Sequence, residues 1–473
     1  MIEFTERTDR QAGIELIEYL RILRDVGDNF NPLDYDRAGE VLRYLTNGSR
    51  NRIASIRALS DKSLIKQETL YQISCLEDRF NPISPDGQFG IKKVRAILTW
   101  AESLGRIRRP TFVQEMVEEL GLDPQTFFVM TEVPEDTIED QVKRTKDAYI
   151  NCGYKFEKKD LRRYRKDHAF QTRYGQEEIE RTFHEAKDRL VPIMRDSLGV
   201  SYIPEFKTEF VQEDKYFKVW SSADSNGHWM KINTHKRHDG KWDPGQVGRL
   251  VVHEYEHAFE GEELGRRVAS GELNPIHAVT IIPGPYQWRS ESFADSITRF
   301  FPEIYNEMTV FEKAAVEYEI LKQEVLRNAH IRVNFKREPR TRIRSYIQTY
   351  LLADSHRDVK RYLDERMENL QYRAYFLAYG GVKEMCSFAE MLKSQNPLND
   401  RRSEFARSFL KRQMAPIEVL NEFRRLENTI PVQYRAPFSQ RVVAVSDTVY
   451  ENFRSFLIGK PRWEQIYPIS NSF

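Results

Sequence analysis

Hydrophobic residues recur at helical spacing along most of the chain. Apolar positions three or four residues apart mark an amphipathic helix over residues 14–23 and another over 113–120, which Gly121 closes. The same spacing predicts helices over 312–328 and 358–370. The pattern therefore indicates a mainly α protein.

Strand patterns are confined to a short central stretch. The segments Tyr216–Ser222 and His228–Asn233 flank Ala-Asp-Ser-Asn-Gly, a sequence suited to a hairpin turn. Arg441–Val445 is a candidate for one further strand. We therefore expect an α+β fold in which a small β-sheet lies beside a helix that follows the hairpin.

The first 135 residues differ from the rest because they are strongly helical. Pro124 and Pro134 flank a junction, since proline interrupts helices. The length of the chain suggests more than one domain. We expect an N-terminal helical region over residues 1–135 and a second domain over residues 136–473.

The most informative motif is the run from His253 to His257, His-Glu-Tyr-Glu-His, within an apolar-tending segment. Residues four apart share one helix face, so His253 and His257 can both direct a ring nitrogen at one metal ion while Glu254 faces its water. Histidine is scarce, with 10 in 473 residues, so this spacing rarely arises by chance. Two structural histidines on an ordinary helix are the plainer alternative.

Glu256 is unusual between two metal-binding histidines, because that position is generally uncharged in zinc peptidases. A buried carboxylate without a partner is costly. We expect Glu256 to face solvent or a basic residue.

A catalytic zinc ion needs three protein ligands and an open position for water. Glu291 is the best candidate for the third ligand, and it lies on a predicted second helix after a Pro-Gly-Pro turn. Asp295 lies one turn further along the same face, where it can accept the outer N–H of a zinc-bound histidine. A solvated acidic helix face is the alternative.

The combination of HExxH with a later ExxxD resembles the gluzincin metallopeptidases, in which the first glutamate of the second motif is the third zinc ligand. Asn274-Pro275-Ile276, the Pro-Gly-Pro-Tyr turn and the segment 290–301 look like the same stretch in the tubulin tyrosine carboxypeptidases and their bacterial relatives. This chain departs from that family at Tyr255 and Glu256, where small residues are usual.

The resemblance implies a helical zincin-type fold, one Zn²⁺ per chain and hydrolysis of peptide bonds, with carboxypeptidase activity on peptides or protein tails. In such enzymes zinc polarises the scissile carbonyl and acidifies water, while the glutamate of the motif, here Glu254, acts as general base and then acid. A zinc-binding scaffold without turnover is a further alternative, but it would have no need of Glu254.

Three further assignments follow from similar enzymes. An edge strand before the zinc helix pairs with extended substrate, which makes Trp229 and Asn233 candidate substrate-binding residues; a structural hairpin is equally consistent. The segment 373–385 resembles the Tyr-Gly segment of helical metallocarboxypeptidases, which implies an oxyanion donor at Tyr379, with Tyr375 as second choice.

Arg373 or Lys383 could then pair with a substrate's C-terminal carboxylate. Tyrosines at helical spacing are, on the other hand, common in protein cores.

Composition fits an intracellular enzyme. The chain has 73 basic and 72 acidic residues, so no charge of one sign dominates. No apolar run approaches the roughly eighteen residues that span a bilayer, and no secretion signal is apparent. Cys75, Cys152 and Cys386 are widely spaced and indicate no disulfide framework. We expect a cytoplasmic protein with no membrane partner.

The competing class is a nucleic-acid- or protein-binding helical module with a vestigial or structural metal site. Arg106, Arg108 and Arg109 lie in a turn between two predicted helices, and 158–166 and 336–344 are basic runs. The neutral total charge argues against nucleic acid. A di-iron bundle would need a second E-x-x-H, which the sequence lacks.

Overall fold

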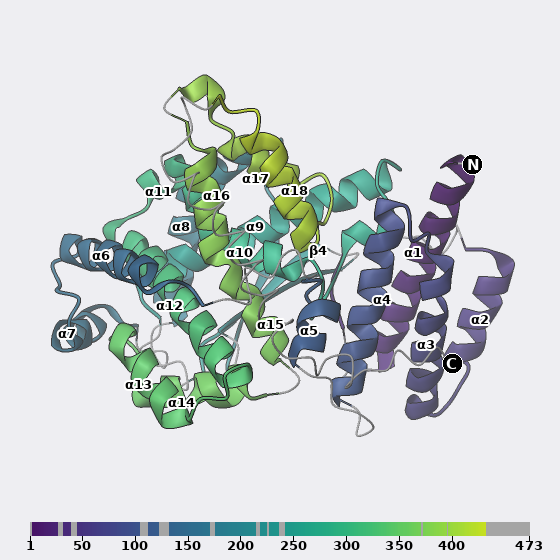
Figure 1. Cartoon of the computed structure of the whole chain (residues 1–473), viewed down its shortest axis with the longest axis horizontal. Helices are drawn as coiled ribbons and strands as arrows, with labels where there is room; N and C mark the ends of the chain where they lie inside the picture. Colours follow the sequence, from purple (N-terminus) through teal and green to yellow (C-terminus); the bar gives the residue numbers. More distant parts are fainter. Residues whose placement is uncertain are drawn as a thin grey trace, which may run out of the picture.

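The computed structural model describes residues 2–26, 32–38, 45–104, 112–122, 132–170, 176–213, 218–224, 227–235, 242–369, 372–394 and 396–431. Helices dominate this part of the chain and a small β-sheet lies among them, so the predicted mainly α architecture with a small sheet is confirmed (Figure 1). Among the described residues, no helix is both long and apolar enough to cross a membrane.

Helix α9 (Pro244–Ala269) is the central element. The Asp243 side chain caps it by accepting a hydrogen bond from the backbone N–H of Gln246, and Pro244 occupies the first turn. The helix is buried along most of its length, with Val251 and Phe259 fully buried. A helix buried all round must find partners for its polar residues inside the protein.

A central apolar core surrounds the first two thirds of α9. It includes α8 (Gln176–Leu198), α10 (Gln287–Phe300) and α12 (Val310–Asn334), all of which pack against α9. Shorter helices complete this core: α5 (Phe112–Glu118), α11 (Pro302–Glu307), α15 (Arg373–Ala378), α16 (Val382–Leu392), α17 (Arg402–Ser408) and α18 (Pro416–Glu427). The short turns η7 (Tyr379–Gly381) and η8 (Pro397–Asn399) connect parts of it.

A second core contains the N-terminal helices. These are α1 (Ile2–Val26), α2 (Asn47–Arg57), α3 (Lys62–Cys75) with the turn η2 (Glu77–Arg79), and α4 (Pro85–Leu104), grouped on one side of the molecule (Figure 1). Leu264 and Val268 of α9 belong to this core, as does Ile276 in η5 (Pro275–Ala278). Residues on both sides of position 135 therefore share one apolar interior.

A third core packs against the outer side of α12. It contains α6 (Glu135–Asn151), α7 (Lys158–His168), α13 (Arg340–Tyr350), α14 (His356–Arg361) and the π-helical turn η6 (Tyr362–Met367). Helix α12 thus separates this core from α9.

The sheet has the strand order β2-β4-β3-β1-β5. Its strands are β1 (Leu33–Asp36), β2 (Phe206–Val211), β3 (Val219–Asp224), β4 (Gly227–Asn233) and β5 (Val279–Ile281). Strands β3 and β4 form the predicted antiparallel hairpin, and β2 pairs in parallel with the other edge of β4. Strand β1 lies between β3 and β5, where Arg21 of α1 donates two hydrogen bonds to Asp36.

Some sequence predictions concern segments outside the described residues. The candidate strand Arg441–Val445 and the arginine-rich turn at 106–109 both belong to this group.

Gly245, in the first turn of α9, allows the start of α12 to approach closely. A Cβ atom at this position would lie 2.3 Å from the backbone oxygen of Phe311. We expect Gly245→Ala to lower the free energy of unfolding by about 1–3 kcal/mol, because neither helix can move without disturbing the core. Denaturant unfolding measures the change. Gly48→Ala in α2 is the control, since a Cβ there has nothing within 4 Å.

Candidate metal centre

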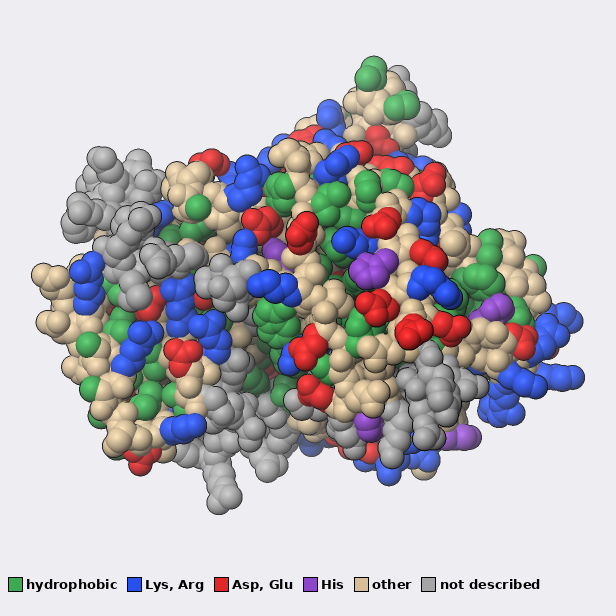
Figure 2. All heavy atoms as spheres, turned by 180° about the vertical axis from the view of Figure 1, so that it is seen from behind, with side chains coloured by type: hydrophobic (Ala, Val, Ile, Leu, Met, Phe, Trp, Pro, Cys, Tyr) green, Lys and Arg blue, Asp and Glu red, His purple; other side chains and the backbone are tan. Residues whose placement is uncertain are grey.

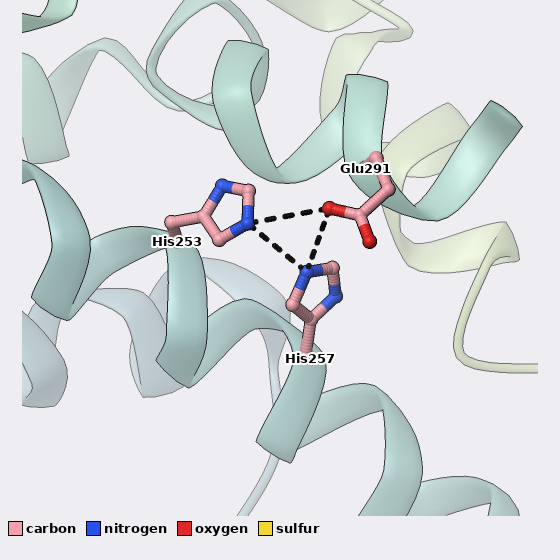
Figure 3. Close-up of side chains that lie close together, drawn as sticks. All are labelled: His253, His257 and Glu291. Carbon is pink, nitrogen blue, oxygen red and sulfur yellow. Dashed lines mark hydrogen bonds and ion pairs between the residues drawn. The ribbon is translucent and has the colours of Figure 1, made fainter. Parts of the chain in front are cut away.

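Helices α9 and α10 place the chemically important side chains against one another. His253 and His257 lie one turn apart on α9, and Glu291 of α10 points between them (Figure 3). All three side chains are at least 86 % buried, with side-chain exposures of 9 %, 14 % and 10 %. The helical spacing of the first motif and the packing of α10 on α9 thus bring together the three residues predicted as metal ligands.

The three ligand atoms form a nearly equilateral triangle. His253 Nε2 and His257 Nε2 are 3.3 Å apart, and Glu291 Oε2 lies 3.4 Å and 3.6 Å from them. Two ligand atoms about 2.1 Å from one tetrahedral metal ion lie about 3.4 Å apart. The described residues at this position could therefore hold a single metal ion.

Glu291 Oε2 itself is buried and accepts no hydrogen bond within the described part of the chain. A buried carboxylate oxygen is normally satisfied by a donor or a cation. Two imidazole nitrogens and one carboxylate oxygen form the donor set of hydrolytic zinc sites.

The three buried ionisable side chains shift one another's pKa values in the metal-free site. Burial opposes protonation of His253, but the nearby Asp295 and Glu291 carboxylates raise its pKa to about 9. Burial likewise opposes protonation of His257, and Glu256 and Glu291 raise its pKa well above the usual value. Burial would raise the pKa of Glu291, yet the nearby His253 and His257 rings outweigh it and lower the pKa.

Asp295 occupies the position predicted for it. Its Oδ1 atom lies 2.9 Å from His253 Nδ1 and also accepts a hydrogen bond of 2.9 Å from Arg249 Nη1. A carboxylate on the outer nitrogen of an imidazole fixes the tautomer that leaves Nε2 free to bind metal. Arg249, one turn before His253 on α9, was not recognised in the sequence, although its spacing of four residues was a usable signal.

Glu256 is buried and has a basic partner, as the cost of burying a carboxylate required. Its Oε1 atom lies 3.8 Å from Nη1 of Arg289, a fully buried residue of α10. Its Oε2 atom lies 3.1 Å from His257 Nδ1, and Ser290 Oγ lies at the same distance from that nitrogen. Arg289 was missed because nothing in a single sequence shows which helix faces Glu256.

Glu254 lies beside the triangle and faces a cavity of about 630 Å³ that the two histidines also line. The hydroxyl of Ser221, on strand β3, donates a short hydrogen bond to Glu254 Oε2. Ser221 is a second residue that the sequence did not single out, because its role depends on how β3 is placed over α9.

Two tyrosines line the same cavity. The Tyr379 ring is stacked near His253, with centroids 6.5 Å apart, and the hydroxyls of Tyr375 and Tyr379 lie 2.9 Å apart. Tyr375 also donates a hydrogen bond of 3.4 Å to Glu291 Oε1. Burial and the charge of Glu291 raise the pKa of Tyr379, so its hydroxyl keeps its proton.

The prediction that the strand Trp229–Asn233 borders the substrate is wrong. This strand, β4, is paired with β2 on one side and β3 on the other, so its backbone cannot pair with a further chain. Asn233 is fully buried and donates to the backbone oxygen of Glu213, and Trp229 borders a separate shallow hollow. The cavity is lined instead by Val219–Ser221 of β3.

The assignment of Arg373 to a substrate carboxylate is also wrong. Its guanidinium donates two hydrogen bonds of 2.6 Å to Glu115 of α5 and lies over the Phe112 ring. This pairing joins α15 to α5. Neither Arg373 nor Lys383 is among the residues that line the cavity.

Other basic residues do line the cavity near the metal ligands. Lys218, Lys322 and Arg249 share this wall with the buried Glu319, which pairs with Lys322 at 2.6 Å. Withdrawal from bulk water, together with the charges of Lys322 and Arg249, lowers the pKa of Lys218 to about 7. Lys322 and Arg249 are paired with the carboxylates of Glu319 and Asp295 on this wall.

Basic runs elsewhere on the chain are at least partly paired. Arg340 forms ion pairs with Asp364 and Glu368, and Lys336 lies 2.9 Å from Glu132. Acidic and basic side chains are interspersed over the face shown in Figure 2. The runs therefore resemble solvated, paired surfaces.

Comparison with known proteins adds information on the fold alone. No protein-family model and no curated protein matches the chain. A crystal structure of a protein described as a lipoprotein from Colwellia psychrerythraea superposes with a TM-score of 0.52 at 15% sequence identity. The match covers 82% of this chain and 64% of the other, so this chain spans less than two thirds of that protein's length.

Metal uptake by this site is expected to displace protons. With the pKa of His253 at about 9 and that of His257 raised, both rings are protonated at pH 7.5 in the metal-free protein, and a metal ion binds only their neutral forms. Adding Zn²⁺ at pH 7.5 should release about two protons per ion bound, and the apparent affinity should rise with pH up to about 9. A pH indicator in weak buffer measures the release.

The control for this measurement is His257→Ala, which should release none. Zinc uptake by the unaltered protein with a release below about half a proton would contradict the raised pKa values.

Proposed function

We propose that the chain is a zinc-dependent peptidase of the gluzincin type, acting as a carboxypeptidase on peptides or protein tails. The observation that carries the proposal is the triangle of His253 Nε2, His257 Nε2 and Glu291 Oε2 beside the carboxylate of Glu254, at the wall of a cavity. Glu254 separates a hydrolytic site from a purely structural one, since zinc held only for folding needs no base.

His253, His257 and Glu291 would hold the zinc ion, which leaves a position open toward the cavity. When bound, zinc polarises a carbonyl group and lowers the pKa of water. The histidines act as neutral ligands, and Asp295 keeps the proton of His253 on Nδ1.

Glu254 is the proposed general base. It takes a proton from the attacking water and later gives it to the amine that leaves. Ser221 donates to Oε2 of this carboxylate, which leaves the other oxygen for the water. Ser221 therefore orients Glu254 rather than acting on the substrate.

Tyr375 and Tyr379 are the proposed donors to the oxyanion that develops on the scissile carbonyl. Both line the cavity, and their hydroxyls are hydrogen-bonded to each other. Because its raised pKa keeps Tyr379 protonated, this hydroxyl can donate at neutral pH.

Basic side chains that line the cavity are the proposed partners of a substrate's free C-terminal carboxylate. Lys218 and Lys322 take the role first assigned to Arg373, because both line the cavity and a substrate carboxylate would favour the charged form of the buried Lys218. Val219–Ser221 of β3 take the place of β4 beside the substrate, because they line the cavity and lie before Ala223, the residue at which β3 pairs with β1.

Hydrolysis should require both the metal ion and the carboxylate of Glu254. Purified protein should contain about one zinc per chain and cleave peptides, and a chelator should abolish cleavage. Glu254→Gln should keep the zinc and lose hydrolysis by at least about a thousandfold, whereas His257→Ala should lose both. Metal content is read by mass spectrometry and cleavage by amine release. An active Glu254→Gln protein would rule out the proposed mechanism.

Cleavage should depend on the negative charge of the substrate's C-terminal carboxylate. A peptide with a free C-terminus should be cleaved at least about tenfold faster than the same peptide with a C-terminal amide, because hydrogen bonds to charged groups contribute about 1.5–3 kcal/mol. Lys218→Met and Lys322→Met should each raise KM for the free acid and reduce this preference. Lys313→Met is the control, since Lys313 lies on the same helix as Lys322 but bonds to the backbone oxygen of Asn306.

Equal cleavage of both peptides by the unaltered protein would contradict carboxypeptidase action while leaving zinc-dependent hydrolysis in place.

A further inference from the structure

Glu256 makes a contact that the geometry of a regular helix does not favour. Consecutive residues on a helix point in different directions and do not normally meet. Nevertheless Glu256 Oε2 lies 3.1 Å from Nδ1 of His257, the nitrogen on the far side of the ring from the candidate metal position.

Arg289 is the basic residue that faces Glu256 from the neighbouring helix. It is fully buried, projects from α10 and lies with Nη1 3.8 Å from Glu256 Oε1. The two oxygens of one carboxylate thus face two partners, Arg289 on one side and His257 on the other. A short ion pair between Arg289 and Glu260, one turn further along α9, fixes the guanidinium from the opposite end.

A second metal ion is not needed to explain this cluster. Ligand atoms of Glu256, His257 and Glu260 lie within 4.8 Å of one another, a spacing that could hold a cation. The guanidinium of Arg289 already lies against both carboxylates. Arg289 is therefore the cation of this cluster.

The arrangement repeats the one behind the other histidine. His253 Nδ1 lies 2.9 Å from Asp295, which accepts a hydrogen bond from Arg249. His257 Nδ1 lies at an ion-pair distance of 3.1 Å from Glu256, which faces Arg289, while the hydrogen bond at that nitrogen is with Ser290 Oγ. Glu256 Oε2 itself makes no hydrogen bond among the described residues. Each imidazole is thus followed by a carboxylate and then by an arginine.

We propose that Glu256, held by Arg289, is a positioning residue that keeps the proton of His257 on Nδ1 and directs Nε2 toward the metal. The inference rests on the metal site proposed above. A carboxylate behind a metal-bound imidazole raises its basicity as a ligand, and loss of such a partner typically weakens metal binding by about 10–100-fold. Glu256 thereby strengthens the site that its charge would otherwise be expected to disturb.

The test compares zinc affinity in variants that remove one charge each. Glu256→Gln keeps the size of the side chain, and we expect the zinc dissociation constant, measured by competition with a chromophoric chelator, to rise by about 10–100-fold. Asp295→Asn should show a similar rise. Glu260→Gln is the matched control, because Glu260 also pairs with the Arg289 guanidinium and the substitution removes the same negative charge. The zinc dissociation constant of this variant should stay within about threefold of that of the unaltered protein.

A second readout separates positioning from general stability. The visible absorption spectrum of the Co²⁺-loaded protein reports the ligand geometry, and it should change in Glu256→Gln but not in Glu260→Gln. Thermal unfolding of each metal-free variant shows whether it is folded. If Glu256→Gln fails to fold, Glu256→Asp keeps the charge and should bind zinc more weakly with an altered Co²⁺ spectrum.

The outcomes distinguish this inference from the function on which it rests. If the unaltered protein binds no zinc, the metal site itself is wrong. If it binds zinc and Glu256→Gln binds equally well, only the role of Glu256 is overturned. Equal weakening in Glu256→Gln and Glu260→Gln, or weakening in Ser290→Ala alone, also overturns it, because the effect would then arise from the charge near Arg289 or from the Ser290 hydroxyl.

Discussion

The burial of α9 is the constraint on which the rest of the structure depends. This helix carries two histidines and three glutamates into the interior within eight residues, from His253 to Glu260. Buried charges destabilise a protein severely unless they are paired. Helix α10 supplies the complement from its own buried face, with Arg289, Glu291 and Asp295 all directed at α9. The two helices therefore form one electrostatic unit.

Within this unit the carboxylates outnumber the arginines that pair with them. In the part of the chain that the structure describes, two arginines form ion pairs with the five carboxylates of this unit: Arg249 pairs with Asp295, and Arg289 pairs with Glu256 and Glu260. The other two carboxylates are Glu254 and Glu291. Protons on the two histidines supply positive charge when no metal is bound, as the raised pKa of His253 indicates. A divalent cation can take over that role. The same electrostatic demand thus accounts for the basic histidines and for a site suited to a metal ion.

Local geometry explains which parts could be predicted from the sequence. The face shared by His253, Glu254 and His257 is a property of any helix, so their placement needed no knowledge of the fold. The pairing of β3 with β4 could also be predicted, because the two strands are neighbours in the sequence. The order of strands in the sheet could not, and this is why β4 was taken for an edge. Arg373 was misassigned because its partner, Glu115, lies 258 residues away. Arg289 was overlooked because its partners Glu256 and Glu260 lie on another helix, and the sequence does not show how the two helices face each other.

Helix α9 passes from the central core, through Phe259, into the core of the N-terminal helices, through Leu264 and Val268. Because one helix contributes side chains to both cores, unfolding of either core removes apolar contacts of α9. The N-terminal helices are thus joined through α9 to the turn that carries His253 and His257, and a ligand bound at that turn would stabilise helices that it does not touch. Backbone amides of α1 and α4 should consequently exchange with solvent more slowly once the site is filled.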